Sequence, residues 1–170
     1  MRRRAAVMAG PGPGSVPLVR FAVPGECVAV LPGSGESLVG APGVGVLLRR
    51  GNLFDHLTVG RNVVLAGRLA GRRSLRSAGD LLELVGLAGR GDDYPDTLSA
   101  LEGARAGVAV ALAGAPEVVL ADEPAGELDG IAARELMDLL CAVAARGTAV
   151  VVATRDPEIA AAAQRIVRVA

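Results

Sequence analysis

One stretch of the chain constrains its fold more than any other: a short apolar run that ends in two adjacent carboxylates. Residues 118–121 read Val-Val-Leu-Ala, a β-branched run that is typical of a buried strand. Asp122 and Glu123 follow at once, and Pro124 and Gly126 then turn the chain. Ligands of open α/β sheets bind outside the carboxyl ends of strands. The stretch therefore indicates either a catalytic strand end or an ordinary turn with acidic residues facing water.

Apolar patterns along the rest of the chain predict one domain in which strands and helices alternate. The length of 170 residues allows a single core, built largely from small side chains because aromatic residues make up only 2%. Residues 1–15 are rich in Arg, Gly and Pro and are expected to be loose, whereas 16–170 form the domain. Further strands are expected at 16–23, 27–31, 148–154 and 164–169, and helices at 62–69 after an N-cap at Thr58, at 74–89, after Ser99, and at 131–146 before Gly147.

Charge and cysteine content narrow the function classes. The formal net charge is zero, so no general attraction to nucleic acid is expected, and every basic residue is an arginine. No run of about 18 apolar residues occurs, so we expect a cytoplasmic protein that can dock at the inner face of the plasma membrane. Cys27 and Cys141 lie far apart in the sequence and are interpreted as buried small residues in a reducing compartment. His56, the only histidine, is expected to be exposed.

The run Val-Leu-Ala-Asp-Glu-Pro-Ala-Gly-Glu-Leu-Asp at 119–129 resembles the Walker B strand and D-loop of ABC transporter ATPases. It is most similar to the branch that serves lipoprotein release, macrolide export and cell division. The resemblance implies that Asp122 orders magnesium and that Glu123 polarises the attacking water. It also assigns Asp129 to the D-loop, which faces a second nucleotide-binding subunit.

An upstream segment resembles the family's phosphate-binding Walker A loop. It ends in Gly-Ser-Gly-Glu-Ser, which implies nucleotide contacts from Gly33, Ser34, Gly35 and Ser37, with the Ser37 hydroxyl also on magnesium. Such a loop works because backbone N–H groups wrap the phosphates and a lysine neutralises them. The lysine position here holds Glu36, which repels phosphate. A plain Gly/Ser turn between two strands remains the alternative interpretation.

Two more segments resemble the family in the expected order. Residues 49–63 are similar to the Q-loop segment, with Arg49 in place of the glutamine, and 52–58 would face the membrane subunit. Residues 98–112 are similar to the signature segment, which implies a phosphate contact from Ser99, although both signature glycines are replaced. Ser99 and Glu102 also fit a capping box, which is the simpler interpretation.

The switch histidine that contacts the γ-phosphate is replaced by Arg155. Taken together, the resemblance implies an α/β fold of the P-loop NTPase type. It has a mostly parallel sheet flanked by helices, with the first P-loop helix and part of the antiparallel subdomain shortened or missing.

Three functional hypotheses follow from this resemblance. The first is an ATP-binding subunit of an ABC transporter that uses ATP and Mg²⁺, works with a membrane permease and a second nucleotide-binding subunit, and has impaired hydrolysis. The second is an active ATPase in which Arg155 or a partner's residue neutralises phosphate charge. The third is a regulatory or relic domain that has no nucleotide site and is not an enzyme.

Overall fold

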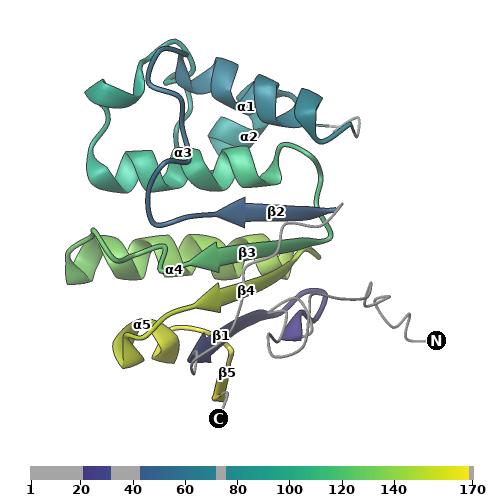
Figure 1. Ribbon diagram of the computed structural model, residues 1–170, viewed down its shortest axis with the longest axis vertical. Helices are drawn as coiled ribbons and strands as arrows, with labels where there is room; N and C mark the ends of the chain where they lie inside the picture. The colour runs from purple at the N-terminus through teal and green to yellow at the C-terminus, as the bar shows by residue number, and fades with distance from the viewer. Residues whose placement is uncertain (1–20, 32–42, 72–75, 169–170) are drawn as a thin grey trace, which may run out of the picture.

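The computed structural model describes residues 21–31, 43–71 and 76–168, and within them a single parallel sheet forms the centre (Figure 1). Its strands lie in the order β2-β3-β4-β1-β5. Their bounds are β1 Cys27–Leu31, β2 Val44–Leu47, β3 Val118–Asp122, β4 Ala149–Ala153 and β5 Arg165–Arg168. Every paired strand runs parallel to its neighbour. The carboxyl ends of all five strands therefore meet at one edge of the sheet.

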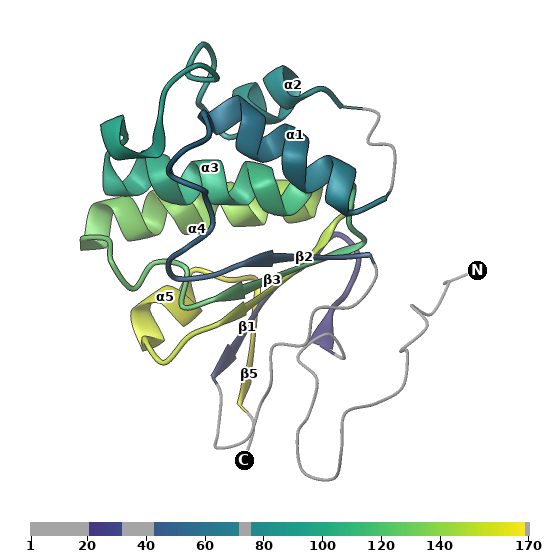
Figure 2. The ribbon, with the colours of Figure 1, turned by 45° about the horizontal axis from the view of Figure 1, so that its top comes forward.

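The helices pack their apolar residues on one face of this sheet. Their bounds are α1 Val59–Leu69, α2 Ala78–Leu84, α3 Ala100–Leu112, α4 Gly130–Ala145 and α5 Pro157–Ala161, with a 3₁₀ turn at Pro95–Thr97. Figure 2 shows α1, α3 and α4 on the same side of the strands. Leu136, Met137 and Leu140 of α4 are fully buried there, against Val119 of β3 and Val150 of β4. This face holds the larger of the two cores.

The opposite face of the sheet carries a smaller apolar cluster. Val28 and Val30 of β1, Leu120 of β3 and Val151 of β4 point to this side, because side chains alternate along a strand. Both faces of the central strands are thus apolar, which is why β1, β3 and β4 read as continuous hydrophobic runs. In the described part of the chain, only Phe21 and Ala22 add to this cluster from outside the strands.

Local sequence signals set the helix boundaries. Thr58 caps α1, since its hydroxyl accepts a hydrogen bond from the Arg61 N–H at 3.3 Å. Gly147 follows α4 with φ of 108°, a conformation that a glycine adopts at little cost. Both boundary predictions are confirmed. The helix expected at 74–89 was predicted too long: α2 ends at Leu84, because Gly86 and Gly89 take φ of 77° and 78°.

Three elements were not predicted from the sequence. Several predicted features lie outside the described part of the chain. β2, α5 and the 3₁₀ turn were not predicted, whereas 21–23, the described end of the strand expected at 16–23, forms no strand. Gly33, Ser34, Gly35 and Ser37 lie outside the described residues, as does the segment 1–15. The predicted parallel sheet flanked by helices is confirmed. No described helix is both long and apolar enough to cross a bilayer.

Candidate functional site at the carboxyl edge of the sheet

The two carboxylates of the opening motif lie where neighbouring strands β3 and β4 end. Asp122 is the last residue of β3 and stands in register with Ala153, the last residue of β4. Glu123 follows Asp122, and Arg155 follows β4 after Thr154. The fold thus brings Asp122, Glu123 and Arg155 together at one edge of the sheet.

Glu123 is held against the end of β4 by both its backbone and its side chain. Its N–H donates to the Ala153 carbonyl at 2.8 Å, which extends the β3–β4 ladder by one bond. One carboxylate oxygen accepts from the Arg155 N–H at 2.8 Å and the other from the Thr154 hydroxyl at 3.0 Å. Glu123 also has φ of 43°, which costs a non-glycine residue about 1 kcal/mol. The surrounding bonds therefore hold it in a strained but defined orientation.

Thr154 is the residue that sequence reasoning missed at this site. Its side chain is only 1% exposed, and its hydroxyl accepts from the Asp156 N–H at 3.1 Å while donating to Glu123. Thr154 is therefore a buried polar link between the two strand ends. The only signal in the sequence was a threonine that closes an apolar run, and nothing local pointed to a partner 31 residues away.

Asp122 has a different environment from its neighbour. Burial and the adjacent Glu123 carboxylate raise the pKa of Asp122, while the positive charge of Arg155 acts in the opposite direction. Within the described residues its side chain makes no hydrogen bond of its own. A partly buried carboxylate of this kind can serve as a Mg²⁺ ligand. Magnesium would need further oxygen ligands, and no cluster of three or more ligating side chains occurs among the described residues.

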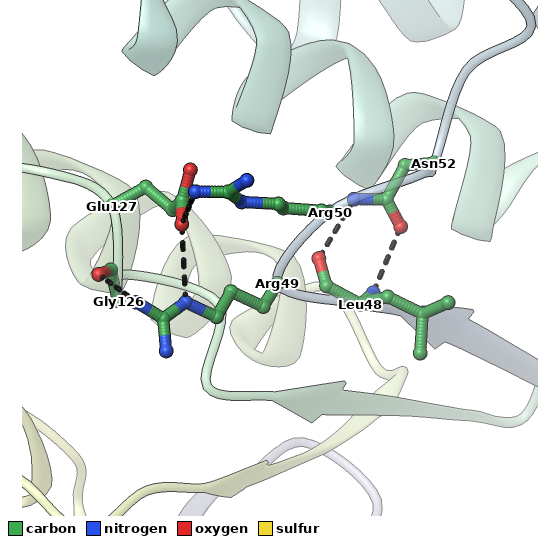
Figure 3. Close-up of polar contacts among 6 residues, drawn as sticks. All are labelled: Leu48, Arg49, Arg50, Asn52, Gly126 and Glu127. Carbon is green, nitrogen blue, oxygen red and sulfur yellow. Dashed lines mark hydrogen bonds and ion pairs between the residues drawn. The ribbon is translucent and has the colours of Figure 1, made fainter.

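Arg49, at the position of the family's glutamine, is tied to the turn that follows the carboxylates (Figure 3). Its guanidinium donates to the Gly126 carbonyl at 2.8 Å and lies 3.3 Å from the Glu127 carboxylate. Arg50 contacts the same carboxylate at 2.6 Å. Hydrogen bonding from Arg50 lowers the pKa of Glu127. Sequence reasoning missed this cluster of Arg49, Arg50 and Glu127, since it joins residues nearly 80 positions apart.

Asn52 shapes the same segment. Its side chain pairs with both the N–H and the carbonyl of Leu48, at 2.8 and 2.7 Å (Figure 3). Asn52 also packs onto α3, where a Cβ added at Gly107 would lie 3.1 Å from its side chain. The segment after β2 is therefore fixed on both sides, by Asn52 and by Arg49.

The loop at 52–58 presents an apolar side chain to the outside. Asn62 of α1, which is 3% exposed, accepts from the Phe54 N–H at 2.8 Å and donates to three loop carbonyls. This buried amide fixes the loop, while Phe54 stays 55% exposed beside an exposed His56. The prediction that His56 is exposed is confirmed. Next to the loop lies a groove of about 360 Å³, lined by 48–53, the first turns of α3 and the turn at 124–128.

Ser99 and Asp129, the remaining predicted site residues, each cap a helix. The Ser99 hydroxyl accepts from the Glu102 N–H at 3.3 Å, and the Glu102 carboxylate accepts from the Ser99 N–H at 2.9 Å. The predicted capping box is thus confirmed. Asp129 accepts from the N–H groups of Ile131 and Ala132 at 3.1 and 2.9 Å and begins α4. Both caps are exposed at the surface.

The chain is similar to known proteins in both sequence and fold. No family model matches the chain. Macrolide export ATP-binding/permease proteins MacB of Shigella flexneri and of Escherichia coli K12 are 34% identical over 152 residues, which is 88% of this chain. The chain spans only about a quarter (24%) of the length of these curated relatives.

Solved structures of ATP-binding cassettes share the fold. The dimeric post-hydrolysis state of the cassette MJ0796, bound to ADP and Pi, has a TM-score of 0.64 at 23% identity and covers 85% of this chain and 81% of that one. A second dimeric structure of this bacterial ABC transporter cassette has a TM-score of 0.63 and covers 87% and 82%. By its sequence relatives and its fold, the chain belongs with the ATP-binding cassettes of ABC transporters.

Proposed function

We propose that the chain is an ABC-type nucleotide-binding subunit with impaired hydrolysis, which docks onto a membrane permease and pairs with a second cassette. The observation that carries this proposal is the binding of both Glu123 carboxylate oxygens by Thr154 and the Arg155 N–H. A general base has to reach its water at hydrogen-bond distance with the correct orientation. The Glu123 carboxylate is instead directed at the end of β4 and acts as a link between two strands.

The short connection between β1 and β2 supports weakened phosphate binding. Residues 32–43 are all that separates Leu31 from Val44. A phosphate-wrapping loop takes about eight residues, and a helix of ordinary length takes about 11 more. This connection must also cross from β1 past β4 and β3 to β2, which is about 14 Å. Twelve positions are fewer than the roughly 19 that such a loop and such a helix take together.

Charge supports the same proposal. Glu36 stands where the family has lysine, and at a separation of 4 Å a unit charge pair contributes about 4 kcal/mol at an effective dielectric constant of 20. Exchange of an attractive lysine for a repelling glutamate therefore weakens phosphate binding strongly. Asp122 and Ser37 would hold Mg²⁺, which supplies charge neutralisation for the phosphates of ATP when it is bound. Arg155, exposed beside Asp122, adds the only positive side chain of the described β3–β4 strand ends.

The loop at 52–58 is the proposed contact with the permease. Hydrogen bonds from Asn62 already order this loop, so that Phe54 can contact a partner without a further loss of loop entropy. The groove beside it, which is lined by charged as well as apolar residues, gives a segment of the partner a place to enter. Asp129 and the exposed Ile131, at the start of α4, are the proposed contact with the second cassette.

A regulatory or relic domain without a nucleotide site is the second candidate. The cluster of Arg49, Arg50 and Glu127 favours it, because the residue in the metal-sensing position is already bound to the 126–127 turn. In that case the hydrogen bonds of Glu123 at the carboxyl edge of the sheet would only stabilise the fold.

Calorimetric titration of the full chain with Mg-ATP separates these functions. We expect weak, magnesium-dependent binding that becomes at least roughly tenfold tighter in Glu36→Lys, since the repelling charge is replaced by an attracting one. An absence of any binding heat in both proteins would favour the relic domain. Docking is tested by co-purification from membranes, where Phe54→Ser should reduce recovery of the permease. Leu69→Ser, a change at another exposed apolar residue, is the matched control.

A further inference from the structure

The two cysteines, which the sequence placed in unrelated segments, meet between β1 and α4. Cys27 is the first residue of β1 and is fully buried, whereas Cys141 lies on α4 and is partly exposed. The Cys27 and Cys141 side chains interact with each other, and the Cys141 thiol donates a hydrogen bond to the Ala162 carbonyl at 3.7 Å. The prediction that both cysteines are buried is therefore confirmed for Cys27, whereas Cys141 is only partly buried.

The turn before β5 holds both cysteines in place. The Cys27 N–H donates to the Gln164 side-chain oxygen at 2.6 Å, and the Cys27 carbonyl accepts from the Gln164 N–H at 3.0 Å. Cys141 contacts the same turn through the Ala162 carbonyl. Residues 162–164 thus form a shared support under the two thiols, with each cysteine on a different rigid element.

We propose that Cys27 and Cys141 are a redox modification site, which closes to an intrachain disulfide when a hydroperoxide oxidises Cys141. Their environments suit two different roles. The hydrogen bond from Cys27 lowers the pKa of the Cys141 thiol, so that the more accessible sulfur is also the better nucleophile. The bond to Cys141, followed by burial, raises the pKa of Cys27. Cys141 is therefore the attacking thiol and Cys27 the resolving one.

The reaction balances without a further reagent. The Cys141 thiolate attacks one oxygen of the peroxide, the O–O bond breaks, and Cys141 becomes a sulfenic acid as water or an alcohol leaves. The Cys27 sulfur then attacks the Cys141 sulfur, the S–O bond breaks, and the departing hydroxide takes the Cys27 proton as water. Two electrons pass from the two sulfurs to the peroxide. A thiol reductant returns the pair to its starting state.

Closure requires the two sulfurs to approach each other to a bond length of about 2.05 Å. The bond would connect β1 to α4 covalently. In the reducing compartment expected for this chain, such a disulfide is transient rather than permanent. A crosslink over a long loop also disfavours the unfolded chain.

Thiol counting after peroxide treatment tests the site directly. The full chain has two cysteines, so the reduced protein should show two free thiols when denatured, and none after treatment with hydrogen peroxide. The expected product is a monomer whose mass is lower by two hydrogen atoms, and a proteolytic map should join Cys27 to Cys141. Oxidation should raise Tm by roughly 5–10 °C. Both changes should be reversed by dithiothreitol.

Two variants separate the roles of the thiols. Cys141→Ser, a change at the partly exposed position, should leave Cys27 unreactive because it is buried. Cys27→Ala should let Cys141 proceed to sulfinic acid, since no resolving thiol is present. Persistence of two free thiols in the wild type, a disulfide only between chains, or the same Cys141 oxidation with Cys27 present would each overturn the proposal. The wild-type map and Cys141→Ser decide this even if Cys27→Ala does not fold.

Discussion

Glu123 at the end of β3 and Ser99 at the start of α3 both occupy positions that resemble active residues of the family, yet they are used in different ways. Glu123 bonds to Thr154 across 31 residues, and that partner is buried. Ser99 bonds to Glu102 three residues away, at the surface. A retained family residue can thus serve stability either through a long-range link or through a local cap. The two uses predict stability effects of different size.

The largest effect is expected from Glu123→Ala. This change removes the acceptor of the Thr154 hydroxyl and of the Arg155 N–H, and Thr154 is buried. Loss of the partners of buried polar groups should lower the free energy of unfolding by about 2–3 kcal/mol. Urea denaturation of both proteins measures the difference.

Glu123→Gln is the matched control for that prediction. The amide oxygen can still accept from the Arg155 N–H, and its NH₂ can donate to the Thr154 hydroxyl. The hydroxyl proton then loses its acceptor, so the loss should be about 1 kcal/mol, smaller than that of Glu123→Ala. If Glu123→Ala were as stable as the wild type, Glu123 would not link the strands, and its carboxylate would be available to polarise a water molecule.

A smaller effect is expected from Ser99→Ala. Removal of an N-cap side chain costs about 1 kcal/mol, because one helix N–H loses its acceptor. The urea midpoint should fall accordingly, with an unchanged slope. A Ser99/Glu102 double-mutant cycle then reports their coupling. A drop as large as that of Glu123→Ala would remove the contrast between the local cap and the long-range link.

The smallest effect is expected from Asp122→Asn, and it should depend on pH. The pKa of Asp122 is raised in the folded chain, so the folded state binds its proton more tightly than the unfolded state does. Stability from this group is therefore lost as pH rises through the raised pKa. At pH 7 the amide should therefore make the folded chain slightly more stable than the carboxylate does. Unfolding at pH 7 and pH 3 should show that gain vanish at the lower value.

Features determined by neighbouring residues could be predicted from the sequence. The capping box at Ser99 and Glu102, the cap at Thr58 and the strand at 118–121 all follow from local patterns, and each is confirmed. Order along the chain also identified the family. The contacts of Glu123, Arg49 and Cys27 could not be predicted, since each joins segments that only the sheet order and the helix packing bring together.

Phosphate release from Mg-ATP tests the central claim most directly. We predict that the full chain releases no more phosphate than its Glu123→Gln variant, because the Glu123 carboxylate is bound to β4 and the phosphate-holding lysine is absent. Steady turnover by the wild type that disappears in Glu123→Gln would contradict the account and would show an active ATPase.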